Sequence, residues 1–459
     1  MSDQRRIDRV ITIAEAMASS PGSSLPGMFQ HPYDVKAAYQ LLAHPEATPD
    51  NLQAGHRQLV QDHLAQPGHY LLIQDKTTFS WSGKQPISGL GLIGDGQAGL
   101  QGVHVHSTLA VEWPVEREGA PARPPVRLLG LADQTYFVRQ AAPGGSRRGE
   151  SSAERKRRKR ESEVWAESLQ RLGSPPETSC WTLVADREAD IYEVLLSCQQ
   201  QGYDYVIRAA QNRALATEVM VAGGRLQRLH ELARQLPSLG QCELFLRGRQ
   251  GQPERWAQLQ LSACPVRLRA PWRPGQGIGN LPVIECSVVR VWEAAASDGA
   301  GLEWLLLCRN PVTSFVLAHE RMQQYSCRWL AEELHKGIKT GLKAEDLQLS
   351  TGARLSAALA LMSVVALRLI DLKERLRCAP EAAATEAGLS ETELTVLKAY
   401  SAKPCTTVRE VALALGRLGG HLNRKGDGPP GWITLWRGTI RLGHLVDGYL
   451  LACNLHEFG

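Results

Sequence analysis

Apolar residues recur with a helical period near both ends of the chain and with a strand period between them. Residues 4–66 carry apolar side chains three and four positions apart, as in "RRIDRVITIAEAMAS" and "DVKAAYQLLA", which predicts helices. From residue 70 the period becomes two, and "HYLLIQDKTTFSW" and "GVHVHSTLAVEW" predict strands. We expect the first of these strands to end near Asp75. The pattern therefore predicts a helical N-terminal region followed by a sheet.

The middle of the chain predicts an α/β core that is interrupted by a β-rich segment. "CWTLVADREADIYEVLLSCQQQ" has the pattern of a strand, a turn and a helix, and "YDYVIRAAQN" adds a strand. Between residues 214 and 300, alternating strands with Pro and Gly turns predict an all-β insertion. "LEWLLLCRNP" then predicts a buried strand. The apolar run 355–370 is broken by Arg368 and is shorter than the ~20 residues a bilayer requires, so it predicts a buried core helix.

Composition narrows the class of protein without deciding its function. The 459 residues suggest about two to four domains, and the 43% hydrophobic and 22% charged residues are typical of a soluble globular protein. A net charge of +5 permits a polyanionic partner but does not require one. The ten cysteines are scattered without a CxxC pair, and the N-terminus has no signal peptide. We therefore expect reduced cysteines, a cytoplasmic location and no membrane partner.

The segment "YSCRWLAEELHKGIK", residues 325–339, predicts a helix with a narrow polar stripe. At about 100° per residue, four polar side chains of a regular helix here fall within an arc of about 60°. These side chains are Tyr325, Arg328, Glu332 and Lys339. The apolar residues between Leu330 and Ile338 fall on the opposite side, where they would anchor the helix. A solvated face with an Arg–Glu pair one turn apart explains this helix when it is taken alone.

Two further carboxylates change that interpretation. Asp75 follows the apolar strand "HYLLIQ", and Asp186 follows "WTLVA". Strand ends are where an α/β sheet presents ligands, although each aspartate taken singly also fits a turn or an N-cap. With Glu332 they make three acids.

Mg²⁺ binds carboxylate oxygens, and two such ions about 3.5–4 Å apart stabilise both the attacking and the leaving oxygen in phosphodiester cleavage. Three carboxylates can hold such a pair, and the other side chains of the stripe would then donate to phosphates.

These residues carry a family resemblance. The spacing Y-x2-R-x3-E-x6-K within residues 325–339 resembles the signature of DDE transposases of the cut-and-paste insertion-sequence-four type. "LLIQDKTT" and "VADREADIYEVL" resemble the two aspartate segments of that family. "EWLLLCRNP" resembles its strand with a base-trapping tryptophan, and "VALALGRLGGHLNRKGDGPPGWITLWRG" resembles its C-terminal region. The resemblance covers nearly the whole chain, and the four-residue signature together with the second aspartate segment is specific.

The resemblance implies an RNase H-like core that holds two Mg²⁺ or Mn²⁺ ions at Asp75, Asp186 and Glu332. It implies a DNA-associated bacterial protein that nicks transposon ends, forms and resolves a hairpin, and transfers the 3′-OH to target DNA. A flipped base would stack on Trp304, a contact worth about 1–3 kcal/mol, and Arg208 would contact the end DNA. A core tryptophan and a salt-bridged arginine are the alternatives at these two positions.

The same resemblance divides the chain into five regions. We expect a helical DNA-binding region at 1–66, core segments at 67–213 and 301–374, the β-rich insertion at 214–300 and a helical region at 375–459. The last region, with Trp432 and Trp436, is our candidate for pairing two protomers as a homodimer on two DNA ends. Family members usually have a further segment before the first helix, and this chain begins after it, so we expect an intact or lightly truncated transposase.

Other interpretations are open. A catalytically silent or inhibitory DNA-binding relative is the second candidate, and the presence of all three acids counts against it. A glycoside hydrolase with two carboxylates would explain the acids but not the polar stripe.

His104 and His106 alternate on one strand without a third ligand, so we expect them to pack in the sheet. The basic run "ERKRRKRE", within residues 141–163, predicts a solvated loop, with DNA phosphates as a secondary possibility. Four acids beside the motifs are interpreted as supporting or solvated: Glu188, Asp190, Glu333 and Glu345.

Overall fold

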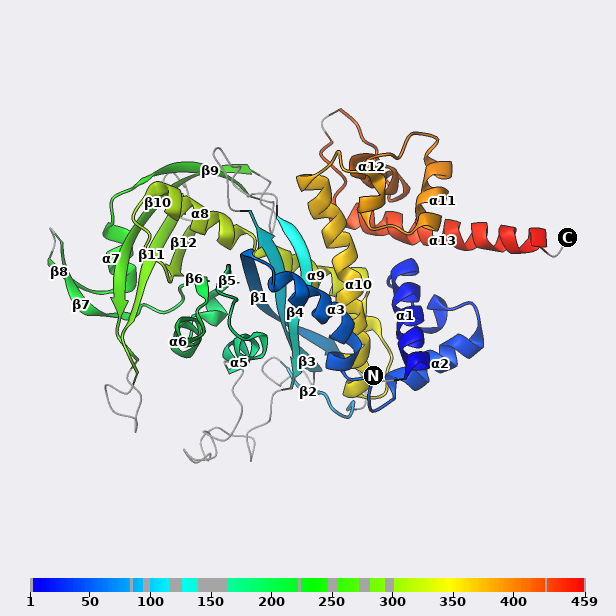
Figure 1. The fold of residues 1–459 in the computed structure, drawn as a ribbon, viewed down its shortest axis with the longest axis horizontal. Helices are drawn as coiled ribbons and strands as arrows, with labels where there is room; N and C mark the ends of the chain where they lie inside the picture. The colour runs from blue at the N-terminus through cyan, green and yellow to red at the C-terminus, as the bar shows by residue number, and fades with distance from the viewer. Residues whose placement is uncertain are drawn as a thin grey trace.

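A mixed β-sheet with helices on both faces forms the body of the protein, and further helices lie at both ends of the chain (Figure 1). The computed structural model describes residues 3–82, 86–93, 100–114, 126–138, 163–221, 224–246, 255–271, 281–293, 301–425 and 427–457. The described strands follow the order β2-β3-β1-β5-β6-β12-β11-β10-β7-β8, with β4 beside β3 and β9 beside β10. The predicted α/β class is confirmed at this level.

The N-terminal region is helical, as the sequence predicts. It contains α1 (Gln4–Ser19), the short 3-10 turn η1 (Pro26–Met28), α2 (Pro32–Leu42) and α3 (Pro49–Leu64). The Thr48 side chain caps α3 by accepting a hydrogen bond from the Asn51 N–H over 3.3 Å. Helix α3 packs on the sheet at β4 and on the long helix α10 (Gly352–Cys378), so this region is joined to the core.

The central strand β1 (Gly68–Trp81) lies between β3 (Gln101–Trp113), which is antiparallel to it, and β5 (Ser179–Ala185), which is parallel. The expectation that this strand ends near Asp75 is wrong. Strand β3 continues to pair with β1 as far as Trp81, opposite Gln101, so the ladder extends the strand. The remaining strands on this side are β2 (Gly91–Leu92), β4 (Arg127–Phe137) and β6 (Asp204–Arg208).

The β-rich segment extends the core sheet. Strand β12 (Glu303–Cys308) pairs with β6 on one side and with β11 (Ile284–Glu293) on the other. The other strands of the segment are β7 (Ala214–Val221), β8 (Gly224–Arg228), β9 (Gly240–Leu246) and β10 (Arg255–Leu268). The expectation of an all-β segment is wrong, because α7 (Leu229–Gln235) lies within it and buries Leu229, Leu232 and Ala233 at helical spacing.

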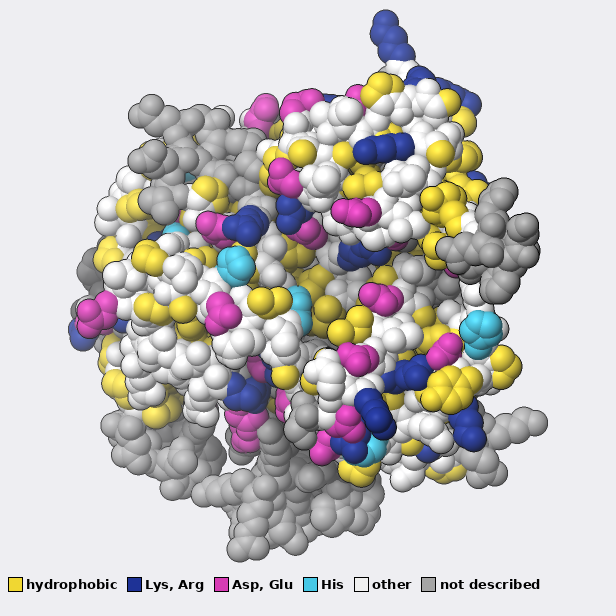
Figure 2. Space-filling view, turned by 45° about the vertical axis from the view of Figure 1, so that its right-hand side comes forward, with side chains coloured by type: hydrophobic (Ala, Val, Ile, Leu, Met, Phe, Trp, Pro, Cys, Tyr) yellow, Lys and Arg dark blue, Asp and Glu magenta, His cyan; other side chains and the backbone are white. Residues whose placement is uncertain are grey.

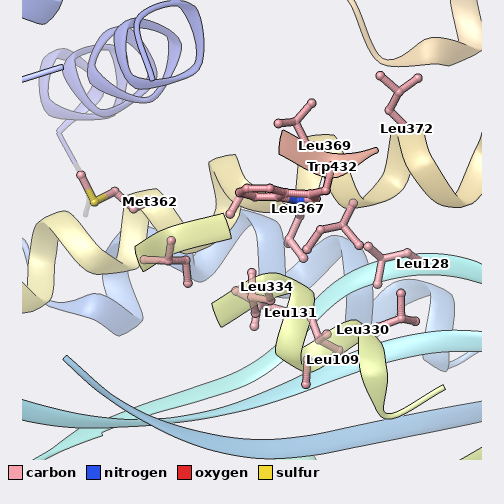
Figure 3. Packing of buried hydrophobic residues seen from close by; sticks show 14 of the residues in the cluster. Leu109, Leu128, Leu131, Leu330, Leu334, Met362, Leu367, Leu369, Leu372 and Trp432 are labelled. Carbon is pink, nitrogen blue, oxygen red and sulfur yellow. The ribbon is translucent and has the colours of Figure 1, made fainter. Parts of the chain in front are cut away.

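Two helical layers cover the sheet. One face packs on α5 (Glu163–Leu172) and α6 (Tyr192–Gln201), and the other packs on α9 (Trp329–Lys336) and α10 (Gly352–Cys378) (Figure 1). Helix α3 packs beside β4 and contributes buried residues to both layers. The period-two pattern of β1 divides its side chains between these layers. Figure 3 shows Leu330 and Leu334 of α9 between the sheet leucines and α10. These apolar residues anchor α9, as the sequence predicts.

Helix α10 is the long core helix. The sequence predicts its apolar run to stop at 370, but the helix continues to Cys378. Arg368 donates to the Gly388 carbonyl and pairs with Glu393. By length and composition α10 could cross a membrane, yet 72% of its most apolar stretch is buried inside the protein. The burial agrees with the predicted core helix. Helix α10 also crosses the expected region boundary at residue 374.

The C-terminal region consists of η6 (Ala384–Ala387), α11 (Glu391–Ser401), α12 (Val408–Leu418) and α13 (Trp432–Glu457). Figure 1 shows α13 extending past α11 and α12 toward the C-terminus. Its extended part exposes Leu445, Tyr449, Leu450 and Leu451. Among the described residues on the face in Figure 2, basic and acidic side chains are interspersed.

Candidate active site

Strand register places Asp75 beside Asp186. In the parallel pair β1–β5, Gln74 lies opposite Ala185, and this is the last paired position. The two aspartates are the next residues on these strands, and neighbouring strands lie about 4.8 Å apart. Strand β5 ends there in the 3-10 turn η3 (Arg187–Ala189), where the Asp186 carboxylate accepts a hydrogen bond from the Glu188 N–H over 3.3 Å. Strand β1 continues, so Asp75 lies within a strand and Asp186 lies at a strand end.

The expected regular helix over residues 325–339 is replaced by three segments. Helix α8 (Phe315–Ser326) ends after Tyr325, α9 begins at Trp329, and Gly337–Gly341 forms the π-helical turn η4. The single stripe calculated for a continuous helix is therefore wrong. Tyr325 belongs to α8 and is buried, and Arg328 is the residue that precedes α9.

The Arg328 guanidinium lies among the three predicted acids. Its nitrogens are 3.6 Å from an Asp75 oxygen and 3.9 Å from an Asp186 oxygen, and they donate a short hydrogen bond to Glu332. The exposed fractions of the four side chains range from 15% to 32%. Tertiary folding thus brings carboxylates from two strands and one helix to a single cation, which partly balances their charge.

Burial and mutual repulsion alter the protonation of this cluster. Burial raises the pKa of Asp75 to about 6, the Arg328 charge and the Lys76 N–H oppose the rise, and the charges of Asp186 and Glu332 add to it. Burial lowers the pKa of Arg328, but the neighbouring groups, led by Tyr325 and Glu332, outweigh burial and raise it. Arg328 is therefore a permanent cation in this site.

His335 is a site neighbour that the sequence did not single out. Its Nδ1 is 3.8 Å from an Asp75 oxygen. Burial, reinforced by the charge of Lys339, lowers the pKa of His335 to about 3, so the ring is neutral. In the sequence, His335 could have been recognised as a site neighbour from its position one turn after Glu332 on the same helix.

Carboxylate oxygens are suitable ligands for Mg²⁺ or Mn²⁺, and the convergence of three acids matches that chemistry. In the described part of the chain, no group of three His, Cys, Asp or Glu side chains is arranged as a ready metal site. The guanidinium of Arg328 lies among Asp75, Asp186 and Glu332 instead. The carboxylates are of the donor type that such a cation takes, and Arg328 supplies the positive charge in this arrangement.

The predicted DNA-contacting residues have different contacts in the structure. Trp304 is half-buried on β12, with its ring edge-on to Tyr325 at a centroid distance of 5.0 Å. Arg208 is the last residue of β6, and it donates to the Glu303 carbonyl over 3.1 Å. Burial raises the pKa of Tyr325, and the positive charge of Arg208 opposes that rise. Lys339 lies apart from these residues on η4, with its ammonium 5.3 Å from the centre of the Phe79 ring.

Buried ion pairs fix the two helices that carry the site. Arg321 of α8 contacts Asp204 of β6 over 2.7 Å, and both side chains are buried. Glu333 of α9 is paired with Lys373 of α10 and accepts a hydrogen bond from the Trp329 indole over 3.2 Å. Glu333 is turned about 100° from Glu332, so its attachment to α10 directs Glu332 toward β1.

The other acids singled out by sequence have supporting contacts. Glu188 lies 3.0 Å from the Lys76 ammonium, and Glu345 accepts hydrogen bonds from the Ser80 N–H and hydroxyl. Asp190 is buried and accepts from two backbone N–H groups at 2.7 Å, which closes the loop after β6. Sequence position alone did not separate these anchoring roles from solvated ones.

The structure describes the two histidines and the cysteines singled out by sequence, whereas the basic run lies outside the described residues. His104 and His106 are buried in the sheet, where they pack on Phe137 and Trp165, so the expected packing role is confirmed. The basic run lies in residues 139–162, outside the described residues, together with its predicted DNA contacts. None of the ten cysteines is in a disulfide, as expected.

Comparison with known families adds a finding at the N-terminus. A family model described as transposase DNA-binding matches residues 1–47. This match supports a transposase, with DNA as its partner. The matched segment contains α1 and α2, which the Arg9–Asp34 ion pair joins to each other, and α1 packs against α10 and α13.

Proposed function

We propose that this protein is a DNA transposase of the DDE type, resembling the insertion-sequence-four family, with an RNase H-like core. The convergence of Asp75, Asp186 and Glu332 on one guanidinium at the β1–β5 edge carries the proposal. The transposase DNA-binding match at residues 1–47 supports DNA as the substrate. A catalytically silent or inhibitory relative remains the second candidate, distinguished by the absence of cleavage.

In this proposal the three carboxylates hold two Mg²⁺ or Mn²⁺ ions. When bound, such ions supply Lewis-acid stabilisation of the attacking and leaving oxygens of a phosphodiester. Arg328 and Lys339 donate to the phosphates of the scissile strand, and the buried Tyr325 supports the guanidinium, whose carbon lies 5.9 Å from its ring centre. Arg208 contacts the end DNA, and the exposed apolar part of α13 pairs two protomers on two ends.

Incubation with the DNA that flanks its own gene tests the proposed function directly. With Mg²⁺ present, we expect a nick at each transposon end, followed by a hairpin on the opposite strand, and neither product with chelator. Labelled DNA on a denaturing gel resolves both species. Specific binding of this DNA without any nick would instead favour the silent relative.

Trp304→Ala should impair hairpin formation more than first-strand nicking. A flipped base needs an aromatic shelf, and loss of about 1–3 kcal/mol of stacking predicts a roughly 5- to 150-fold slower hairpin step. Rapid-quench time courses give the two rates separately. Trp256→Ala is the matched control, because Trp256 is 63% exposed on β10, away from Tyr325. Equal slowing of both steps by Trp304→Ala would refute the base-stacking role.

A further inference from the structure

The turn that carries Lys339 has an unusual backbone. In η4, the Leu342 N–H donates to the Gly337 carbonyl over 2.9 Å, the hydrogen-bond pattern of a π-helix. Such turns within helical runs are often found at functional sites, and they change the direction in which side chains leave the helix. The direction of Lys339 therefore depends on what holds this turn in place.

Two glycines of η4 face the start of α13. A Cβ added to Gly341 would lie 2.7 Å from the ring of Trp436 and 2.9 Å from the ring of Trp432. A Cβ added to Gly337 would lie 3.5 Å from the Trp432 ring. Carbon atoms at separations below 3 Å repel strongly, so glycine lets both indoles contact the backbone of η4.

The two tryptophans form a rigid unit. Their rings are stacked with centroids 5.3 Å apart and an interplanar angle of 13°, and both side chains are buried. Figure 3 shows Trp432 beside Leu367 and Leu369 of α10. The Lys336 ammonium, one residue before η4, lies 5.7 Å from the centre of the Trp432 ring. The start of α13 thus contacts η4 through both indole rings.

We propose that the Trp432–Trp436 stack, referred to below as the indole pair, positions Lys339 for its contact with the scissile strand. Lys339 lies between the two glycines and rests over Phe79 on β1, the strand that also carries Asp75. The start of α13 is therefore part of the active site's support, in addition to any pairing role of its distal end. This inference rests on the proposed function, in which Lys339 contacts a phosphate.

Gly341→Ala tests the inference, because its methyl group displaces η4 from the indole pair. We expect cleavage in the preformed protein–DNA complex to slow about tenfold, a 1.4 kcal/mol change in barrier, with the Kd for end DNA unchanged. Gly428→Ala is the matched control, since a Cβ there meets no atom within 4 Å. It should cleave at the wild-type rate.

A double-mutant cycle separates positioning of Lys339 from a general loss of structure. In a Lys339→Ala background, Gly341→Ala should cause no further slowing. An equal slowing in both backgrounds, or none in the wild-type background, would overturn the proposal. If Gly341→Ala lowers the melting temperature into the assay range, the same cycle is run with Trp436→Phe, which keeps an aromatic ring but withdraws part of the contact. Failure of the wild-type protein to cleave would count against the proposed function instead.

Discussion

Alanine substitution of Asp75, Asp186 or Glu332, one at a time, is expected to abolish strand cleavage. Each substitution removes a carboxylate from a cluster of three that would hold the catalytic cations, and the loss should exceed roughly 10³-fold. DNA binding should persist, because removing negative charge does not weaken attraction to phosphates. Nicking of labelled end DNA with Mg²⁺, and a filter-binding or anisotropy Kd for the same DNA, measure the two effects.

Glu177→Ala is the matched control for these variants, because Glu177 is an exposed acid in the turn before β5, outside the site. It should cleave like the wild-type protein. A variant of Asp75, Asp186 or Glu332 that keeps cleaving would remove that residue from the active site. Loss of DNA binding together with cleavage would show that the cluster has a structural role.

Arg328→Met is expected to destabilise the protein when no divalent cation is present. The guanidinium balances the charge of three half-buried carboxylates. Losing hydrogen bonds to charged groups lowers the free energy of unfolding by roughly 1.5–3 kcal/mol. Without it, the repulsion between Asp75, Asp186 and Glu332 is unshielded. Added Mg²⁺ should then raise the Tm of the variant more than that of the wild type, because a cation replaces the lost charge. Calorimetry with and without Mg²⁺ measures both changes.

Arg409→Met provides the comparison for this experiment. Arg409 pairs with Glu381 on the surface, where 54% and 72% of the two side chains are exposed, so its loss should change stability by less than about 1 kcal/mol. Its Mg²⁺ response should match the wild type. If Arg328→Met has wild-type stability, or gains no more from Mg²⁺ than the wild type does, the carboxylates do not share Arg328 as their counter-ion.

The helix break near Arg328 illustrates what sequence could not predict. No proline or glycine marks the boundary between α8 and α9. The two helices are fixed by different partners, since Arg321 anchors α8 to β6 and Glu333 anchors α9 to α10. A continuous helix would have to direct Arg321 toward β6 and Glu333 toward α10 along a single axis. The period of the apolar residues correctly predicted the buried side of α9, because that side depends only on neighbours within two turns.

The end of β1 was mispredicted for a related reason. The apolar run before Asp75 stops, and the sequence after it, "KTTFSW", is weakly patterned. Pairing with β3 keeps the strand extended to Trp81, where the partner residue is Gln101, outside the local sequence window. Strand length in a sheet is set by the ladder as well as by local propensity.

The sequence by itself determined the helical ends, the α/β pattern between them, the buried face of α9 and the identity of three acids with a cationic neighbour. These features depend on residue types and on spacing within a few turns or strand residues. Only the tertiary structure decided that Asp75 and Asp186 are register neighbours, that Arg328 lies among all three acids, and that α13 packs on the turn that carries Lys339. Contacts between distant segments arise from the packing of whole layers, which no local pattern encodes.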